Sequence, residues 1–207
     1  IANKGIWTAK KRYILNVWDS EGVRYEKPKL KMMGIEAVKS STPAACRTSI
    51  KDCLTVIMNQ DEEATQKFIA DFREEFSSLP IEDISFPRGC NNLNKWSNPT
   101  TIYSKGTPIH VRGALLYNFY NKKNKLTHKY PLIQDGEKIK FVYLRTPNKI
   151  NENVISYLNT FPKEFGLDKQ VDYELQFQKS FLEPIKVILE KIGWQPEKTA
   201  SLEFLFG

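Results

Sequence analysis

A chain of 207 residues with 41% hydrophobic and 12% aromatic content can bury a substantial core, so we expect one large or two small globular domains. No stretch approaches the roughly 18 consecutive apolar residues of a bilayer-spanning helix, which excludes a protein with such helices. The formal net charge of +7 and the pI near 9.2 favour a polyanionic partner.

The positive charge is distributed unevenly along the chain. Residues 1–31 carry eight Lys or Arg against three Asp or Glu, and residues 95–150 carry eleven against two. Residues 61–83, in contrast, carry eight acids against two bases. This pattern indicates one face for a polyanion and another turned away from it. Chance clustering on a solvated surface is the alternative interpretation.

The first residue is Ile1 and no apolar signal core comes after it, so we expect a piece of a larger polypeptide without a secretory signal. Cys46, Cys53 and Cys90 form no Cys-x-x-Cys pair and are odd in number. They favour reduced thiols over a disulfide framework, and Cys46 and Cys53 are expected to be small apolar groups on one helix. With two histidines and no cysteine pair, no metal site is expected.

The first 34 residues predict extended structure. Residues 7–18 alternate as a strand, residues 19–22 form a turn, and residues 23–26 return as a second strand. One face of the first strand is expected to carry Tyr13, Leu15 and Val17. Residues 27–34 alternate cations with apolar residues, which indicates an extended segment along a surface.

Two helices are predicted next, and we expect them to form an antiparallel hairpin. Pro43 and the hydroxyl residues before it favour a helix start, and the apolar spacing continues to about Asn59. A second helix starts at Asp61, where acidic residues complement the helix dipole. Its apolar side carries Phe68, Phe72 and Phe76.

The rest of the sequence contains clear signals for some elements and ambiguous signals for others. Residues 80–107 are expected to be irregular, and residues 109–120 are expected to form a helix. Residues 136–144 predict a strand with Ile139, Phe141 and Tyr143 on one face. Residues 154–161 are ambiguous. Residues 168–192 give the longest helix signal, which Pro184 bends or divides and Gly193 ends. Its apolar stripe consists of Val171, Leu175, Leu182, Ile185, Leu189 and Ile192. An apolar cluster at residues 202–206 closes the sequence, and such a cluster at a terminus is unusual unless it packs against a binding surface.

One sequence motif carries a family resemblance. Lys10-Lys11-Arg12-Tyr13 resembles the K-K-R-Y motif that closes the palm domain of family B DNA polymerases. The run that continues to Pro43 is similar to the segment after this motif in T-even-type bacteriophage enzymes, and the resemblance covers nearly the whole chain. The later stretches that resemble the same family are Ile109 to Gly113, Val171 to Tyr173 with Pro184, and Ser201 to Gly207.

The resemblance implies an α+β fold in which a palm-end β-hairpin leads into a mainly helical thumb with a small β element. The implied boundaries are residues 1–38 for the end of the palm, 39–195 for the thumb and 196–207 for a sliding-clamp-binding tail. Such a thumb wraps newly made duplex along its minor groove.

The resemblance also implies DNA-binding residues. Lys11 would reach minor-groove acceptors, which every correct base pair presents, and Lys10 and Arg12 would lie near the primer backbone. Ser41 with its neighbours Ser40 and Thr42 would donate to phosphate, although helix capping explains these residues equally well. His110 and Arg112 would lie near the primer strand, and a packed or solvated histidine is the alternative. The full implied set is Lys10, Lys11, Arg12, Tyr13, Ser40, Ser41, Thr42, His110 and Arg112.

The terminal residues resemble the peptide by which these polymerases hold their sliding clamp, and a tether raises the local concentration of enzyme at the primer end. The implied clamp-binding residues are Ser201, Leu202, Phe204, Leu205 and Phe206. The alternative is an apolar tail folded back on its own domain.

The family's catalytic aspartates do not occur in this sequence, and no cofactor is expected on the chain itself. Mg²⁺ is expected in the palm of the complete enzyme, which also supplies the fingers and exonuclease. We therefore expect the chain to be inactive alone, to act in the cytoplasm of an infected bacterium, and to bind primer-template duplex, the amino-terminal polymerase portion and a phage sliding clamp.

Two further interpretations come from other classes. The first is a non-enzymatic duplex-binding accessory protein that is tethered to a clamp. The second is a self-sufficient nuclease, which would need clustered acids within the basic regions. The acids lie elsewhere in the sequence, which disfavours the nuclease.

Overall fold

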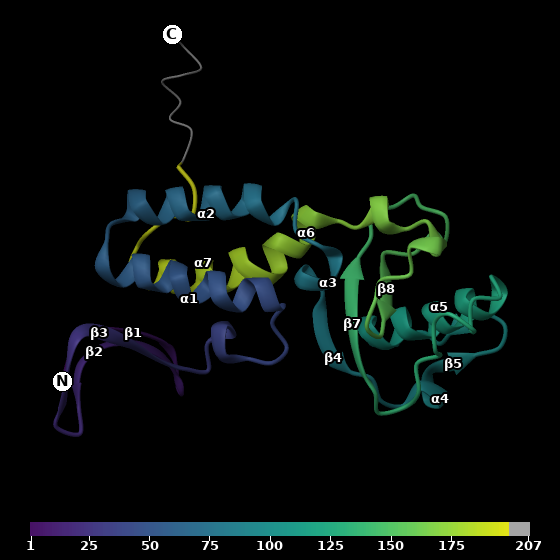
Figure 1. Cartoon of the computed structure of the whole chain (residues 1–207), viewed down its shortest axis with the longest axis horizontal. Coiled ribbons are helices and arrows are strands. Elements are labelled where there is room, and N and C mark those ends of the chain that lie inside the picture. The colour runs from purple at the N-terminus through teal and green to yellow at the C-terminus, as the bar shows by residue number, and fades with distance from the viewer. Residues whose placement is uncertain (199–207) are drawn as a thin grey trace, which may run out of the picture. The chain divides into compact units, whose positions relative to one another are not determined.

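The computed structural model describes residues 1–198 and confirms an α+β fold. These residues form two compact units, which we call unit 1 and unit 2 (Figure 1). Unit 1 contains residues 1–39, 46–78 and 178–198. Unit 2 contains residues 40–45 and 79–177. Within residues 1–198, no helix combines the length and the apolar character that crossing a membrane requires.

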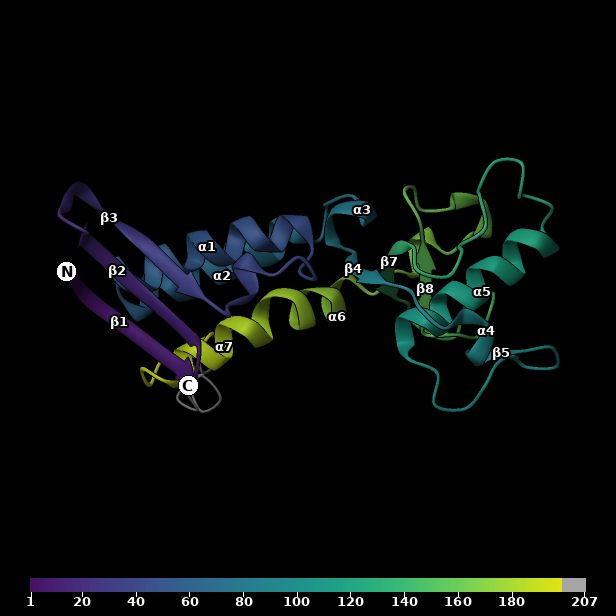
Figure 2. The ribbon, with the colours of Figure 1, turned by 90° about the horizontal axis from the view of Figure 1, so that it is seen from below.

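Unit 1 opens with an antiparallel sheet in the order β1, β2, β3 (Figure 2). Its strands are β1 (Ala2–Ala9), β2 (Arg12–Ser20) and β3 (Val23–Met33). The predicted single strand over residues 7–18 is therefore wrong, because the chain reverses at Lys10 and Lys11. Apolar alternation continues on both sides of this reversal, and neither turn residue is Gly or Asn, so the sequence carries no ordinary turn signal. Residues 27–33, predicted as a surface segment, belong to β3.

A single-turn 3-10 helix, η1 (Glu36–Val38), leads to the helices of unit 1. The predicted helices are confirmed as α1 (Ala44–Asn59) and α2 (Glu62–Phe76), and Figure 1 shows them running in opposite directions. Asp61 caps α2 by accepting a hydrogen bond from the Ala64 backbone N–H at 2.9 Å.

Aromatic packing fills the core of unit 1. The Phe72 ring lies 4.7 Å from that of Phe181 and 5.8 Å from that of Phe76, measured between centroids. Cys46 and Cys53 are fully buried on α1, as predicted, and all three cysteines are free. Burial raises the pKa of Cys46 to about 11 and that of Cys53 to about 12, so both thiols stay protonated and unreactive at neutral pH.

The predicted helix over residues 168–192 is wrong as a continuous element. The chain instead forms η3 (Asp168–Gln170), α6 (Tyr173–Phe177), a π-helical turn η4 (Gln178–Leu182) and α7 (Glu183–Glu190). Val171 pairs with Leu144 in an isolated β-bridge rather than lying on a helix. The wide π turn rotates the buried face, so that Phe177 and Phe181 enter the core while Leu182 stays half-buried.

Pro184 lies in the first turn of α7, where its missing N–H costs no hydrogen bond, so the predicted division of the helix is confirmed. Gly193 comes after this helix with a φ of 73°, a left-handed conformation that suits a helix end. The predicted stop at Gly193 is therefore also confirmed.

Unit 2 is built on an antiparallel sheet in the order β4, β7, β8. Its strands are β4 (Phe86–Gly89), β7 (Lys138–Tyr143) and β8 (Val154–Tyr157), and β8 resolves the ambiguity over residues 154–161. The strand predicted over residues 136–144 is confirmed, as is the helix predicted over 109–120, which is α5 (Ile109–Lys123). Helix α5 packs along β8 (Figure 2).

The segment read as irregular forms several short elements. They are α3 (Ile81–Ile84), α4 (Leu93–Trp96) and a two-stranded ribbon of β5 (Ser97–Asn98) and β6 (Ile102–Tyr103), with η2 (Lys163–Phe165) later in the chain. The fully buried Gln176 of α6 ties unit 2 together. Its side chain accepts from the Tyr143 N–H at 2.9 Å and donates to the Ile84 carbonyl at 2.8 Å.

Candidate nucleic-acid interface

The Lys10–Lys11 turn joins β1 to β2 as a two-residue hairpin loop, because Ala9 pairs directly with Arg12. Both lysines are exposed. Lys11 has a φ of 61°, a left-handed conformation that costs a residue with a side chain about 1–2 kcal/mol. A hairpin tip in this conformation presents two adjacent cations to solvent.

Gly34 supports the backbone of this turn. Its own φ is 66°, and a Cβ atom at this position would lie 2.5 Å from the Lys11 carbonyl oxygen. No side chain fits at so short a distance without a backbone shift. The end of β3 therefore holds the turn in place, and glycine is needed for that close approach.

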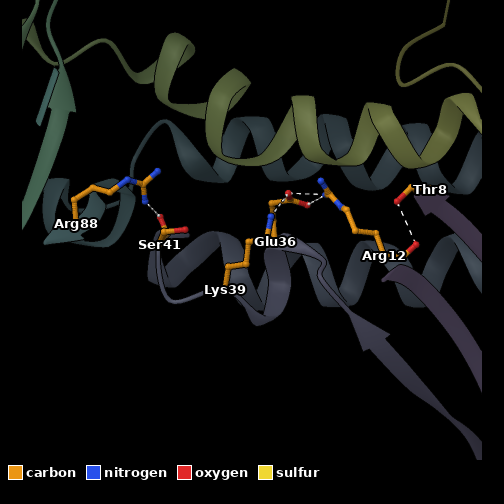
Figure 3. Close-up of polar contacts among 6 residues, drawn as sticks. All are labelled: Thr8, Arg12, Glu36, Lys39, Ser41 and Arg88. Atoms are coloured by element: carbon orange, nitrogen blue, oxygen red, sulfur yellow. Dashed lines mark hydrogen bonds and ion pairs between the residues drawn. The ribbon is translucent and has the colours of Figure 1, made fainter. Parts of the chain in front are cut away.

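Arg12 is engaged by an acidic residue. Its Nη2 donates to both carboxylate oxygens of Glu36, at 2.8 and 3.0 Å, and Lys39 Nζ donates to the same carboxylate at 3.0 Å (Figure 3). Burial by itself would raise the pKa of Glu36, but the Lys39 hydrogen bond and the charges of both cations outweigh it and lower the pKa. Glu36 is thus ionised at neutral pH and offsets the charge of Arg12.

Tyr13 lies in the middle of the sheet of unit 1. It pairs with Trp7 on β1 and with Met33 on β3. Tyr13 is half-buried, whereas Trp7 is 62% exposed and Met33 is 45% exposed. The face of the sheet that these three residues share is therefore partly apolar and reachable from solvent.

Unit 2 contains a second basic feature, a pocket of about 260 Å³ that we call the strand-edge pocket. Arg88 Nη1 donates to the Ser41 carbonyl at 3.0 Å (Figure 3). It also donates to the Pro87 carbonyl at 3.0 Å. Lys138 enters the pocket because it pairs with Gly89 across β4 and β7. The lining residues are Ser40, Ser41, Pro87, Arg88, Gly89 and Lys138.

His110 lies beside the strand-edge pocket. Burial is the main cause that lowers its pKa, the positive charge of Arg88 adds to the effect, and a hydrogen bond to the Gly89 backbone opposes it. The imidazole is therefore neutral at pH 7. His110 therefore contributes no charge to the pocket.

Arg112 and Thr42 lie in other surroundings. Arg112 Nη2 donates to Asn153 Oδ1 at 2.7 Å, its Nη1 lies 3.6 Å from a Glu152 carboxylate oxygen, and its guanidinium lies 5.6 Å from the Tyr103 ring centroid. His110 and Arg112 are two positions apart on α5 and do not face each other. Thr42 is only 5% exposed. The structure thus brings Ser40, Ser41 and His110 to one region of unit 2 and places Arg112 in a separate ion-paired cluster.

Three residues of these features were not found from the sequence. Arg88 lies in the stretch whose conformation could not be predicted, and Lys138 becomes its neighbour only through the pairing of β4 with β7. Gly34 ends an extended segment and carries no turn signature. The one available signal was the basic block over residues 95–150, which contains Lys138 among ten other cations.

The clamp-binding residues predicted from the sequence, Ser201 to Phe206, lie outside the described residues. Within residues 1–198, no group of three or more His, Cys, Asp or Glu side chains is arranged to hold a metal ion. The chemistry that these residues offer is therefore that of cations, hydroxyls and backbone groups, which suits contacts to phosphates and base edges.

Nearly the entire sequence is similar to phage DNA-directed DNA polymerases, and this similarity confirms the resemblance to T-even-type enzymes. The DNA-directed DNA polymerase of Enterobacteria phage T4 is 34% identical over 207 residues, and that of Escherichia phage RB69 is 35% identical over 207 residues. Each match covers 98% of this chain but only 22% of the relative. The chain thus spans about a fifth of these relatives, which is consistent with a carboxy-terminal part. No protein-family model matches the sequence.

Proposed function

We propose that this chain is the carboxy-terminal, duplex-gripping part of a phage replicative DNA-directed DNA polymerase. The observation that carries the proposal is the 34–35% identity to two such polymerases over 98% of the chain. The two basic features of the described residues, the lysine hairpin and the strand-edge pocket, support it.

The lysine hairpin suits a contact in the minor groove. Purine N3 and pyrimidine O2 are acceptors that every correct base pair presents there, so a lysine can sense pairing without reading sequence. Lys10 and Lys11 are both exposed at the tip of a two-residue turn, so their long side chains can reach into the groove while the strands stay outside it. Arg12, which Glu36 holds, fixes the base of the hairpin.

The strand-edge pocket suits a backbone phosphate. Arg88 and Lys138 supply positive charge, and the hydroxyls of Ser40 and Ser41 supply neutral donors. Arg88 is bonded to backbone carbonyls, which are uncharged, so that its positive charge is not cancelled. Charge-assisted hydrogen bonds to such an anion are about twice as strong as neutral ones.

Catalysis is assigned to the portion of the polymerase that this chain lacks. Nucleotidyl transfer uses metal ions held by carboxylates, and we place these Mg²⁺ ligands in the remaining palm. The chain alone is then inactive and works in the infected host cell together with that portion.

Residues 201–206 are proposed to bind the sliding clamp. A clamp-tethered accessory protein without a polymerase partner is the second candidate, which the net charge of +7 also fits.

A chimeric enzyme tests the proposal. The matching 22% of the T4 polymerase would be replaced by this chain, and primer extension measured on a primer-template. We expect extension by the chimera and none by the chain alone. The matched control is the same chimera with Lys10, Lys11, Arg88 and Lys138 changed to Gln, which should extend poorly.

Two outcomes would contradict the proposal. Full activity of the Gln control would show that neither basic feature contributes to duplex binding. No extension by a folded chimera, with duplex binding by the chain retained, would favour the accessory protein.

A further inference from the structure

We infer that unit 2 carries a site for an unpaired nucleotide of single-stranded DNA, centred on Phe119 and separate from the two basic features described above. Phe119 is 41% exposed on α5, whereas its preceding neighbours Leu115, Leu116 and Tyr117 are buried. Burial of the helix does not require an aromatic ring at this exposed position. Part of the ring is therefore open to a ligand.

The Phe119 ring has a fixed orientation and a cation beside it. It packs edge-to-face with Tyr120, with 5.1 Å between centroids and 88° between planes. Lys123 Nζ lies 5.9 Å from the Phe119 ring centroid and 5.6 Å from that of Tyr120. An exposed aromatic ring with neighbouring cations is the usual platform on which single-stranded nucleic acids stack their bases.

A cavity of about 430 Å³ with both polar and apolar walls adjoins the ring, and Phe119 and Lys122 both line it. Small-ligand sites commonly measure about 300–1,000 Å³, so this volume suits one base. The cavity is formed by α4, the β5–β6 ribbon, α5 and residues 132–135, all within unit 2. Its exposed polar groups include Asn94, Gln134 and Asp135.

The walls of the cavity are held by hydrogen bonds. Asn118 on α5 donates to the Ile133 carbonyl at 2.9 Å and accepts from the Ile133 N–H at 2.8 Å. Asp135 accepts from the Leu93 N–H at 2.8 Å. Asn98 uses its side-chain oxygen to accept from Thr100 and Thr101, so its amide nitrogen is the group left to donate. These contacts preform a cavity that offers donors and acceptors to the edge of a base.

Charge around the cavity favours a nucleic acid over a neutral ligand. Residues 118–130 contain four lysines and no acidic residue. Lys122 and Lys123 also complement the dipole at the end of α5, so the lysines alone would not identify a site. Phe119 and the cavity are the observations that the dipole does not explain. Asp135 is the acidic residue of the lining, and it can accept a hydrogen bond from a ring N–H or an amino group of a base.

Single-stranded DNA is favoured over duplex because an isolated ring can stack only on a base whose face is free. In a duplex, both faces of every internal base are already stacked. The site thus differs in ligand as well as in residues from the duplex grip proposed above, and either proposal can fail without the other.

Fluorescence anisotropy of a labelled (dT)12 strand with the 207-residue chain tests the inference. Phe119→Ala should weaken binding about tenfold, because base stacking on an aromatic ring contributes about 1–3 kcal/mol. Phe119→Trp should keep the affinity, and Phe119→Leu, which retains apolar volume, should lose most of it. Lys122→Gln should reduce the slope of log affinity against log salt by about 0.7.

Val187→Ala is the matched control, since Val187 is a 42% exposed apolar residue on α7. It should bind (dT)12 as the unsubstituted chain does. A blunt 16-base-pair duplex should bind the Phe119 variants as well as it binds the unsubstituted chain, whereas Arg88→Gln with Lys138→Gln should weaken duplex binding. The inference is overturned if (dT)12 does not bind, if Phe119→Leu stays within twofold, or if the Phe119 variants lose duplex binding equally.

Discussion

The lysine hairpin of unit 1 and the strand-edge pocket of unit 2 present positive charge in two different ways. The hairpin uses consecutive residues, Lys10 and Lys11, at a turn that Gly34 supports. The pocket collects Ser40, Arg88 and Lys138 from distant parts of the chain. A contiguous motif can be recognised in a sequence, whereas the pocket exists only once β4 pairs with β7.

Arg12, Arg88 and Arg112 differ in the groups to which they donate hydrogen bonds. Arg12 and Arg112 are each offset by a carboxylate, that of Glu36 and that of Glu152. Arg88 instead donates to neutral backbone carbonyls. In the hairpin, the uncompensated charge therefore resides on lysines, and in the pocket it resides on an arginine as well. The partner of each arginine decides whether its charge is available to an anion.

The largest expected effect is a loss of folding stability when the backbone of the lysine hairpin is disturbed. Gly34→Ala should destabilise the protein by about 2–4 kcal/mol, since it adds left-handed strain to a clash with the Lys11 carbonyl. Urea unfolding measures the loss. Gly22→Ala is the matched control, because Gly22 has a φ of 81° but open space around it, so only about 1 kcal/mol is expected. Equal losses of unfolding free energy in the two variants would show that the close approach between Gly34 and the Lys11 carbonyl does not affect stability.

The next effect concerns the pocket. Arg88→Gln with Lys138→Gln should weaken duplex affinity at least tenfold, since even one charge-assisted contact contributes about 1.5–3 kcal/mol. The slope of log affinity against log salt should become shallower by about 2. Anisotropy with duplex DNA at several salt concentrations provides both values. Arg112→Gln serves as the control, and an equal loss there would place the phosphate contact at the Glu152 cluster instead.

A smaller loss of affinity is expected from the hairpin lysines. Lys11→Ala and Lys11→Gly should each weaken duplex binding about threefold, because each removes one exposed cation. The two substitutions should differ in stability, since glycine relieves the left-handed strain by about 1 kcal/mol and alanine does not. Titration with duplex and urea unfolding separate these effects. If glycine preserved the affinity, backbone conformation rather than the side chain would be responsible.

The smallest expected effect is on the pH dependence of folding stability. The pKa of Glu36 is lowered in the folded protein, so its stabilising contribution is present above the unfolded value near 4.5 and is lost as the pH falls through the folded pKa. Glu36→Gln should remove this dependence, with a loss of less than about 1 kcal/mol at pH 7, because the ion pair is only partly buried and solvent screens it.

Unfolding measured from pH 3 to pH 7 checks the Glu36 substitution. The same substitution leaves Arg12 uncompensated, so duplex affinity should rise slightly. A fall in affinity would mean that Glu36 is needed to position the hairpin.

Local chemistry explains which parts of the fold could be predicted. Asp61 and the phenylalanine spacing after it define α2, because the cap and the apolar face both lie within one helix. The π turn at residues 178–182 could not be predicted, since it depends on which rings the core accepts. Val171 looked like part of a helical stripe, but its bridge to Leu144 is a contact between distant residues. Arg88 was missed for the same reason, because its neighbours come from other parts of the chain.

The division of the chain has a consequence for how this protein can be altered. Residues 79–177 form almost all of unit 2 and are a single stretch between α2 and the π turn, so unit 2 is an insertion within unit 1. Inserted modules of this kind can be exchanged as a cassette, because two junctions are enough to remove or replace them. Swapping this stretch between related chains would transfer the Phe119 cavity whole, together with Arg88 and Lys138 of the strand-edge pocket, whereas Ser40, Ser41 and the lysine hairpin would stay with the recipient chain.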